Sequence, residues 1–154
     1  MKKLVFAFST LALLFTSAGC IKDTGCRDQT IQSETGAMAA YASLNGMNPT
    51  THSSGVLYEV TVPGTGPNAA QNSTVKVNYT GKFMDGTIFE TTTTPATFNV
   101  AGTIPGFQVA LQQLKEGGKI RVIIPSSLAY GCAGQGSIPS SAILYFDIEL
   151  LDII

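Results

Sequence analysis

The sequence predicts an α+β domain in which an antiparallel sheet packs on one short amphipathic helix. The chain has 154 residues, 44% of them hydrophobic, which is enough for one core-containing domain and an N-terminal segment. Only 12% of the residues are charged, while Gly, Ser and Thr are abundant, a mixture that favours strands and turns. The formal net charge is −1 and no basic stripe exists, so nucleic acid is not expected as a partner.

Residues 1–19 have the pattern of an export signal. A lysine pair precedes residues 4–15, an apolar run too short to span a bilayer comfortably. Small residues then lead to Cys20 and resemble a bacterial lipobox, although Ser17 occupies the place where a lipobox usually has Leu. We therefore expect an exported protein that is lipid-anchored through Cys20 to a bacterial membrane, on the periplasmic or outer-membrane side. The alternative is an ordinary secretory signal cut near Cys20, with this cysteine free or disulfide-bonded.

The remaining cysteines are Cys26 and Cys132. An exported compartment permits a disulfide between them, and two separate thiols are the alternative. No Cys-x-x-Cys motif or Cys/His cluster is present, so no metal site is expected. The single histidine, His52, lies in a polar linker, which gives Ser-His or Cys-His catalysis little support.

Residues 20–53 are interpreted as a tether that contains a possible short helix. Residues 31–45 carry apolar side chains at roughly helical spacing, namely Ile31, Met38, Tyr41 and Leu44. Gly46 could end such a helix, and Pro49 follows. The domain proper is predicted over residues 54–154.

Strand patterns begin after Gly55. Residues 56–62 form a first strand, and residues 73–83 alternate between apolar and polar side chains. Asp85-Gly86 marks a hairpin turn, after which residues 88–90 resume the strand. A further short strand is predicted over residues 96–100.

One amphipathic helix interrupts the strands. Pro105 suits a first helical position, and Phe107, Ala110, Leu111 and Leu114 share one face before Gly117-Gly118 end the run. Residues 119–125 and 142–154 are predicted strands. Between them, residues 126–141 form a Gly/Ser-rich loop. Its segment 131–136 is glycine-rich but has neither the order of a phosphate-binding loop nor a following helix, and it is interpreted as a flexible flap.

Six local motifs occur in a fixed order along this region. They are Val77-Asn78-Tyr79-Thr80-Gly81, Asp85-Gly86-Thr87-Ile88-Phe89-Glu90, Ile104-Pro105-Gly106-Phe107, Leu114-Lys115-Glu116-Gly117-Gly118-Lys119, Ile124-Pro125-Ser126-Ser127-Leu128-Ala129-Tyr130-Gly131 and Phe146-Asp147-Ile148-Glu149-Leu150. Each motif is weak alone, but the ordered series resembles FK506-binding-protein-type peptidyl-prolyl cis-trans isomerases from about residue 54 onward.

The resemblance implies a five-to-six-stranded antiparallel sheet curled around the short helix, with a shallow apolar pocket between them. It implies catalytic positions at Tyr79, Phe89, Glu90, Ile104, Phe107, Tyr130 and Phe146, and substrate-binding positions at Thr103, Ile138 and Ala96. Each aromatic residue, taken alone, is more often part of the core than of a site, and Glu90 could be a solvated strand end. Only their joint order favours a site.

The resemblance also suggests a role for each group. The rings of Tyr79, Phe89, Phe107 and Phe146 would enclose proline. The Ile104 N–H and the Tyr130 hydroxyl would hold peptide carbonyls, Glu90 would orient Tyr79 or an incoming amide, and a turn around Ile138 would form a rim.

Three positions depart from the family pattern. Phe107 replaces a usual Trp and lacks its N–H, and Glu90 replaces a usual Asp. Ala96 replaces an aromatic residue of some members and opens one wall, so altered specificity is expected.

The function expected from the resemblance is isomerisation of X–Pro bonds in exported proteins as they fold. The alternative is a proline-binding or chaperone module of the same fold with weak or no isomerase activity. The expected partners are proline-containing polypeptides, FK506-like macrolide inhibitors and a membrane reached through the lipid anchor. No cofactor is expected, and the chain is expected to be a monomer.

Overall fold

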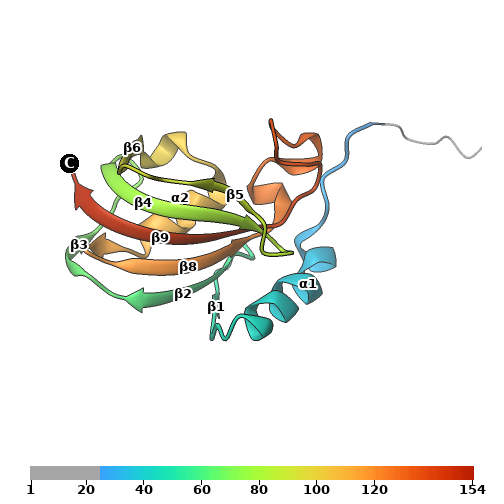
Figure 1. Cartoon of the computed structure of the whole chain (residues 1–154), viewed down its shortest axis with the longest axis horizontal. Helices are drawn as coiled ribbons and strands as arrows, with labels where there is room; N and C mark the ends of the chain where they lie inside the picture. The colour runs from blue at the N-terminus through green and yellow to red at the C-terminus, as the bar shows by residue number, and fades with distance from the viewer. Residues whose placement is uncertain (1–24) are drawn as a thin grey trace, which may run out of the picture.

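The structure is a computed structural model that describes residues 25–154, so the predicted signal segment and Cys20 lie outside the described residues (Figure 1). The main elements in chain order are α1 (Ile31–Leu44), β1 (Thr50–Thr51), β2 (Leu57–Val62), β3 (Thr65–Asn68), β4 (Thr74–Phe83), β5 (Ile88–Thr91), β6 (Ala96–Asn99), α2 (Pro105–Gln112), β7 (Lys115–Glu116), β8 (Lys119–Ile124) and β9 (Leu144–Ile153). Short 3₁₀ turns occupy Val100–Gly102, Ser126–Leu128 and Gly131–Ala133.

One antiparallel sheet organises the molecule. Its strand order is β1-β2-β8-β9-β4-β5, and β6 also pairs with β4. The predicted α+β class with an antiparallel sheet and a short helix is confirmed. The sheet has seven strands where five to six were expected, because Thr50 and Thr51, predicted as linker, pair with Tyr58 and Leu57.

The main core lies between α2 and the inner face of the sheet. Phe107, Ala110 and Leu111 of α2 are buried against strand residues that alternate along β4, β8 and β9. Gly106 permits the close approach of the helix, since a Cβ at this position would lie 2.2 Å from the Ile124 side chain. The apolar face predicted from the helical spacing of these residues is therefore the face that packs on the sheet.

The helix α1 covers part of the opposite face of the sheet. Thr30 caps its N-terminus by accepting a hydrogen bond from the Ser33 N–H. Met38, Tyr41 and Ala42 pack there against a second apolar cluster that includes Leu57, Ile123 and Tyr145.

The predicted helix over residues 31–45 is present, but its buried face differs from the prediction at Leu44. This side chain is 87% exposed. The buried positions are instead Glu34, Met38, Tyr41 and Ala42, which form one continuous stripe on the helix. Arg121 of β8 closes the last turn by donating hydrogen bonds to the carbonyls of Asn45 and Gly46.

A second, two-stranded sheet was not predicted. β3 pairs with β7, with Thr65 opposite Glu116 and Asn68 opposite Lys115. α2 ends at Gln112, before the glycine pair that the sequence suggested as its end. Within residues 25–154, no helix is long and apolar enough to cross a bilayer.

Candidate functional site

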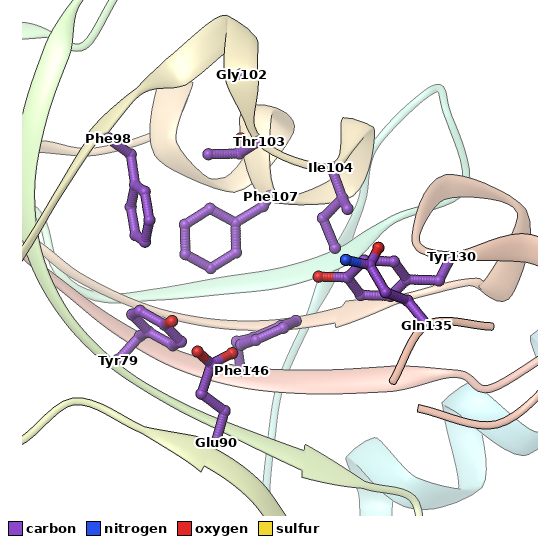
Figure 2. Close-up of a pocket in the computed structure, with 10 residues that line it drawn as sticks. All are labelled: Tyr79, Glu90, Phe98, Gly102, Thr103, Ile104, Phe107, Tyr130, Gln135 and Phe146. Atoms are coloured by element: carbon purple, nitrogen blue, oxygen red, sulfur yellow. The ribbon is translucent and has the colours of Figure 1, made fainter. Parts of the chain in front are cut away.

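A pocket of about 430 Å³ lies between α2, the inner face of the sheet and the loop that follows β8 (Figure 2). Its volume is within the range of small-molecule and peptide side-chain sites. Ten residues line it: Tyr79, Glu90, Phe98, Gly102, Thr103, Ile104, Phe107, Tyr130, Gln135 and Phe146.

Aromatic rings set edge to face form the floor and one wall of this pocket. The ring centroids of Phe107 and Phe146 are 5.2 Å apart, with planes at 84°. Tyr79 lies 5.7 Å from Phe107, and Phe98 lies 6.4 Å from Phe107, both also near perpendicular. Such pairs fix the ring positions through their quadrupoles and leave a flat apolar surface open to the pocket.

Local sequence explains why these rings converge. Alternation along β4 places Val75, Val77 and Tyr79 on the inner face, while Lys76 and Asn78 face outward. Phe146 takes the corresponding inner position on the neighbouring strand β9, opposite Gly81. Phe107 follows Pro105, the first residue of α2, and so projects from the first turn of the helix.

A β-bulge aims two consecutive residues of β5 toward the same side. Lys82 pairs with Ile88 and Gly81 pairs with Glu90, so Phe89 is the extra residue between them. Without the bulge, Phe89 and Glu90 would point to opposite faces; with it, the Phe89 ring packs on the inner side and Glu90 reaches the pocket. Thr91 returns to the outer face, where its hydroxyl lies 2.9 Å from that of Thr80.

Gly81 gives room for the rings beside the bulge. A Cβ built on Gly81 would lie 2.5 Å from the Phe89 ring and 2.8 Å from the Phe146 ring. Phe89 itself does not line the pocket. It stacks behind Phe146 at 5.6 Å and against Phe83 at 4.9 Å, and therefore supports the wall from behind.

Two tyrosine hydroxyls and one carboxylate are the ionisable groups of the pocket. Burial, together with the hydrogen bond and the negative charge of Glu90, raises the pKa of Tyr79. Burial, and then the charge of Glu90, raises the pKa of Tyr130. Both tyrosines are therefore neutral hydrogen-bond donors at physiological pH, and Figure 2 shows the Tyr130 hydroxyl and the Glu90 carboxylate pointing into the pocket.

The loop that carries Tyr130 and Gln135 is held by the N-terminal segment. Cys26 and Cys132 form a disulfide, with their Cα atoms 5.5 Å apart. Next to it, the Cys132 N–H donates to the Asp28 carboxylate at 2.7 Å. Figure 1 shows the blue N-terminal segment running beside the orange loop. Of the two alternatives left open by the sequence, the structure has the disulfide, and the glycine-rich loop is cross-linked through it.

The helix α1 adds a third link to this loop. The carboxylate of Glu34, only 6% exposed, accepts a hydrogen bond of 2.8 Å from the Ser126 N–H. Ser126 starts the 3₁₀ turn Ser126–Leu128, which leads directly into Ala129 and Tyr130.

Most of the predicted site residues meet at this pocket. Those that line it are Tyr79, Glu90, Thr103, Ile104, Phe107, Tyr130 and Phe146. Three do not: Phe89 lies one layer behind, Ala96 lies on β6 opposite Val77, and Ile138 lies in a tight turn where it exchanges hydrogen bonds with Gln135.

Three lining residues were missed by the sequence reasoning. Phe98 lies two residues beyond Ala96 on the same face of β6, so strand alternation could have identified it. Gly102 ends the 3₁₀ turn Val100–Gly102 and Gln135 lies in the loop after β8, and neither position carries such a pattern. Among residues 25–154, no group of three or more His, Cys, Asp or Glu side chains is placed to hold a metal ion.

Comparison with known proteins gives consistent matches. The family model for FKBP-type peptidyl-prolyl cis-trans isomerases matches residues 66–151. The FKBP-type peptidyl-prolyl cis-trans isomerase FkpA of Escherichia coli K12 is 43% identical over 106 residues, which are 67% of this chain and 39% of FkpA. The FKBP-type 22 kDa isomerase of the same organism is 42% identical over 117 residues, covering 73% of this chain and 56% of that protein.

Solved structures agree with these matches. The crystal structure of Escherichia coli FkpA superposes with a TM-score of 0.72 at 36% identity, covering 79% of this chain and 59% of that one. An isomerase structure from Pseudomonas syringae gives a TM-score of 0.68 at 33% identity and covers 82% of this chain and 98% of that one. The chain thus spans about two fifths of the length of the FkpA sequence that it matches.

Proposed function

This chain belongs to the FKBP-type peptidyl-prolyl cis-trans isomerase family, and from that membership we propose that it accelerates X–Pro bond isomerisation in exported polypeptides. The observation that carries the proposal is the edge-to-face arrangement of Tyr79, Phe107 and Phe146 at an open pocket.

The physical mechanism needs no covalent step. Rotation about the prolyl amide must break the double-bond character of the C–N bond, a barrier of about 18–20 kcal/mol. The twisted transition state has lost resonance and has a less polar carbonyl group. An apolar, partly desolvated pocket therefore disfavours the planar ground state more than the twisted state, which lowers the barrier by differential binding.

The polar groups of the pocket have positioning roles in this proposal. The Tyr130 hydroxyl and the Ile104 N–H would hold peptide carbonyls, and Glu90 would orient the Tyr79 hydroxyl, with which it interacts in the free protein. Thr103 would contact the substrate beside Ile104. Phe89 would act from behind by fixing Phe146, while Ala96 and Ile138 would act only on longer substrates, because they do not line the pocket.

An exchange assay on a proline peptide tests the function. Cis–trans exchange rates are measured by NMR with wild-type protein and with Phe107→Leu, which removes one ring and keeps an apolar side chain. We expect kcat/KM to fall about tenfold, because ring–ring contacts and shape are lost at the pocket floor. Phe83→Leu is the matched control, since Phe83 packs on Phe89 and does not line the pocket. Equal activity of wild type and Phe107→Leu would contradict the proposal.

A second candidate is a proline-binding or chaperone module of the same fold. Phe107 in place of the usual Trp, and Ala96 in place of an aromatic residue, are the features that favour it. A macrolide of the FK506 type separates the two functions. Fast exchange that the macrolide blocks supports the isomerase, whereas peptide binding without accelerated exchange supports the binding module.

We also propose export and lipid anchoring through Cys20, on the sequence pattern of residues 1–20. Mass spectrometry of the mature protein from bacterial membranes tests this. A mature N-terminus at acylated Cys20, lost in Cys20→Ala, supports the anchor, and an unmodified mature N-terminus recovered in the soluble fraction contradicts it.

A further inference from the structure

The segments that build most of the pocket carry no charge. Residues 91–114, which supply β6 and α2, contain no Lys, Arg, Asp, Glu or His. Residues 122–146, which supply the end of β8, the Tyr130 loop and the start of β9, contain none either. Among the ten lining residues, Glu90 is the only Lys, Arg, Asp, Glu or His side chain.

Charged side chains on the neighbouring strands β4, β8 and β9 form ion pairs on the face of the sheet that points away from the pocket. Lys82 and Asp147 lie 3.5 Å apart on the outer face of the sheet. Lys119 and Glu149 pair there as well, at 3.1 Å. Glu90 takes part in none of the ion pairs found among residues 25–154. Its charge is therefore not offset by a basic side chain of the pocket wall.

The N-terminal segment places one more pair of charged residues near the loop. Asp28 accepts the Cys132 N–H, and Arg27 precedes it in the chain and is itself engaged. These residues do not line the pocket. The electrostatic character of the pocket itself is thus set by Glu90.

The β5 bulge shows that the position of this carboxylate follows from the backbone. Regular alternation after Phe89 would send residue 90 to the outer face, among the paired charges. The bulge turns it inward instead, where its carboxylate interacts with Tyr79. A hydroxyl partner leaves the carboxylate charged and still able to accept further hydrogen bonds.

We propose that the pocket selects prolines flanked by lysine or arginine and discriminates against prolines flanked by aspartate or glutamate. The inference rests on the proposed function, because it assumes that proline occupies the aromatic floor. A basic side chain next to that proline would then reach a carboxylate that has no basic partner among residues 25–154. An acidic side chain would meet like charge with no cation in the pocket wall to relieve it.

The expected selectivity is modest because Glu90 is exposed to solvent. Attraction between exposed charges corresponds to about a two- to fivefold preference. The preference should weaken as salt is raised, since the Debye length falls from about 10 Å at 0.1 M to about 3 Å at 1 M.

The test uses three peptides that differ only in the two residues flanking proline: lysine, norleucine or glutamate. Norleucine keeps most of the lysine stem and removes its charge. Dissociation constants come from NMR titration of labelled protein, and exchange rates come from the same samples. We expect the lysine peptide to exceed the norleucine peptide by about two- to fivefold in affinity and in exchange rate. The glutamate peptide should fall below the norleucine peptide by a similar factor.

The variant Glu90→Gln removes the charge and keeps an oxygen that can accept the Tyr79 hydroxyl. The ratio of affinities between the lysine and norleucine peptides should approach one in Glu90→Gln. It should persist in Glu116→Gln, which removes an exposed carboxylate that does not line the pocket. Equal affinities for the three peptides in wild type, or an unchanged ratio in Glu90→Gln, would overturn the inference. A lysine preference in binding without any accelerated exchange would support it while defeating the isomerase function.

Discussion

At the scale of single residues, the missing side chain at Gly81 determines how closely Phe89 and Phe146 can approach the sheet. We expect Gly81→Ala to lower the free energy of unfolding by about 1–3 kcal/mol, because the added Cβ would overlap both rings. The displaced Phe146 ring should also reduce the proposed isomerase activity. Urea denaturation and the exchange assay measure the two effects.

The matched control for this substitution is Gly36→Ala in the middle of α1. No heavy atom lies within 4 Å of the Cβ position there, and the helix should gain about 0.5–1 kcal/mol from the alanine. If both variants had the same stability as wild type, the steric account of Gly81 would be wrong.

The raised pKa of Tyr79 predicts a pH dependence of stability. An unfolded tyrosine loses its proton near pH 10, whereas Tyr79 in the folded protein keeps its proton to higher pH. Above pH 10, ionisation therefore stabilises the unfolded state relative to the folded state. The contribution of Tyr79 to the free energy of unfolding is therefore fully present below pH 10 and is lost as the pH rises further.

Denaturant titrations of wild type and Tyr79→Phe at several pH values check this expectation. Between pH 10 and 11, the free energy of unfolding should fall more steeply in wild type than in Tyr79→Phe. Between pH 6 and 9 the difference between the two proteins should stay constant. Parallel curves over the whole range would contradict the expected behaviour.

The family resemblance predicted most of the pocket but not its boundary. It assigned Tyr79, Phe107 and Phe146 to the site through the ordered motifs, and all three line the pocket. Phe89 could not be separated from the lining residues, since the bulge that moves it behind Phe146 leaves no mark in the alternation pattern. Gln135 was missed because an irregular loop has no periodicity to read.

At the scale of elements, α1 supports the loop that carries Tyr130. Glu34→Ala should lower the free energy of unfolding by about 1–3 kcal/mol, because the buried Ser126 N–H would lose its acceptor. Amide hydrogen exchange at Ser126 should become faster. In Glu34→Gln, where an acceptor oxygen remains, both changes should be smaller; equal effects of alanine and glutamine would show that this hydrogen bond is not the stabilising contact.

The strands and helices were predictable where one face is buried and the other is not. The ten-residue strand β4 follows its alternation closely. The pairing of β3 with β7 was not predictable, because Thr65-Gly66-Pro67-Asn68 has the composition of a turn and becomes a strand only through its distant partner. Likewise, helical spacing placed Leu44 on the packed face, although the sheet contacts the stripe beside it.

At the scale of the whole molecule, the disulfide joins two segments 106 residues apart in the sequence. A cross-link of this span restricts the unfolded chain strongly, so Cys26→Ser/Cys132→Ser should lower the free energy of unfolding by about 2–5 kcal/mol. Chemical denaturation with and without a reducing agent measures it. Wild type under reducing conditions should match the double variant. If wild type and the double variant had the same denaturation midpoint, with and without the reducing agent, the cross-link would have no stabilising role.

The bond between Cys26 and Cys132 also has a geometric consequence for the lipid anchor proposed at Cys20. Six peptide units separate Cys20 from Cys26, so the two can be at most about 20 Å apart. An acyl group on Cys20 would keep the disulfide, and with it the loop that carries Tyr130, within roughly that distance of the lipid headgroups. The polypeptides that it could reach first would be those emerging at the bilayer surface, before they diffuse into the surrounding compartment.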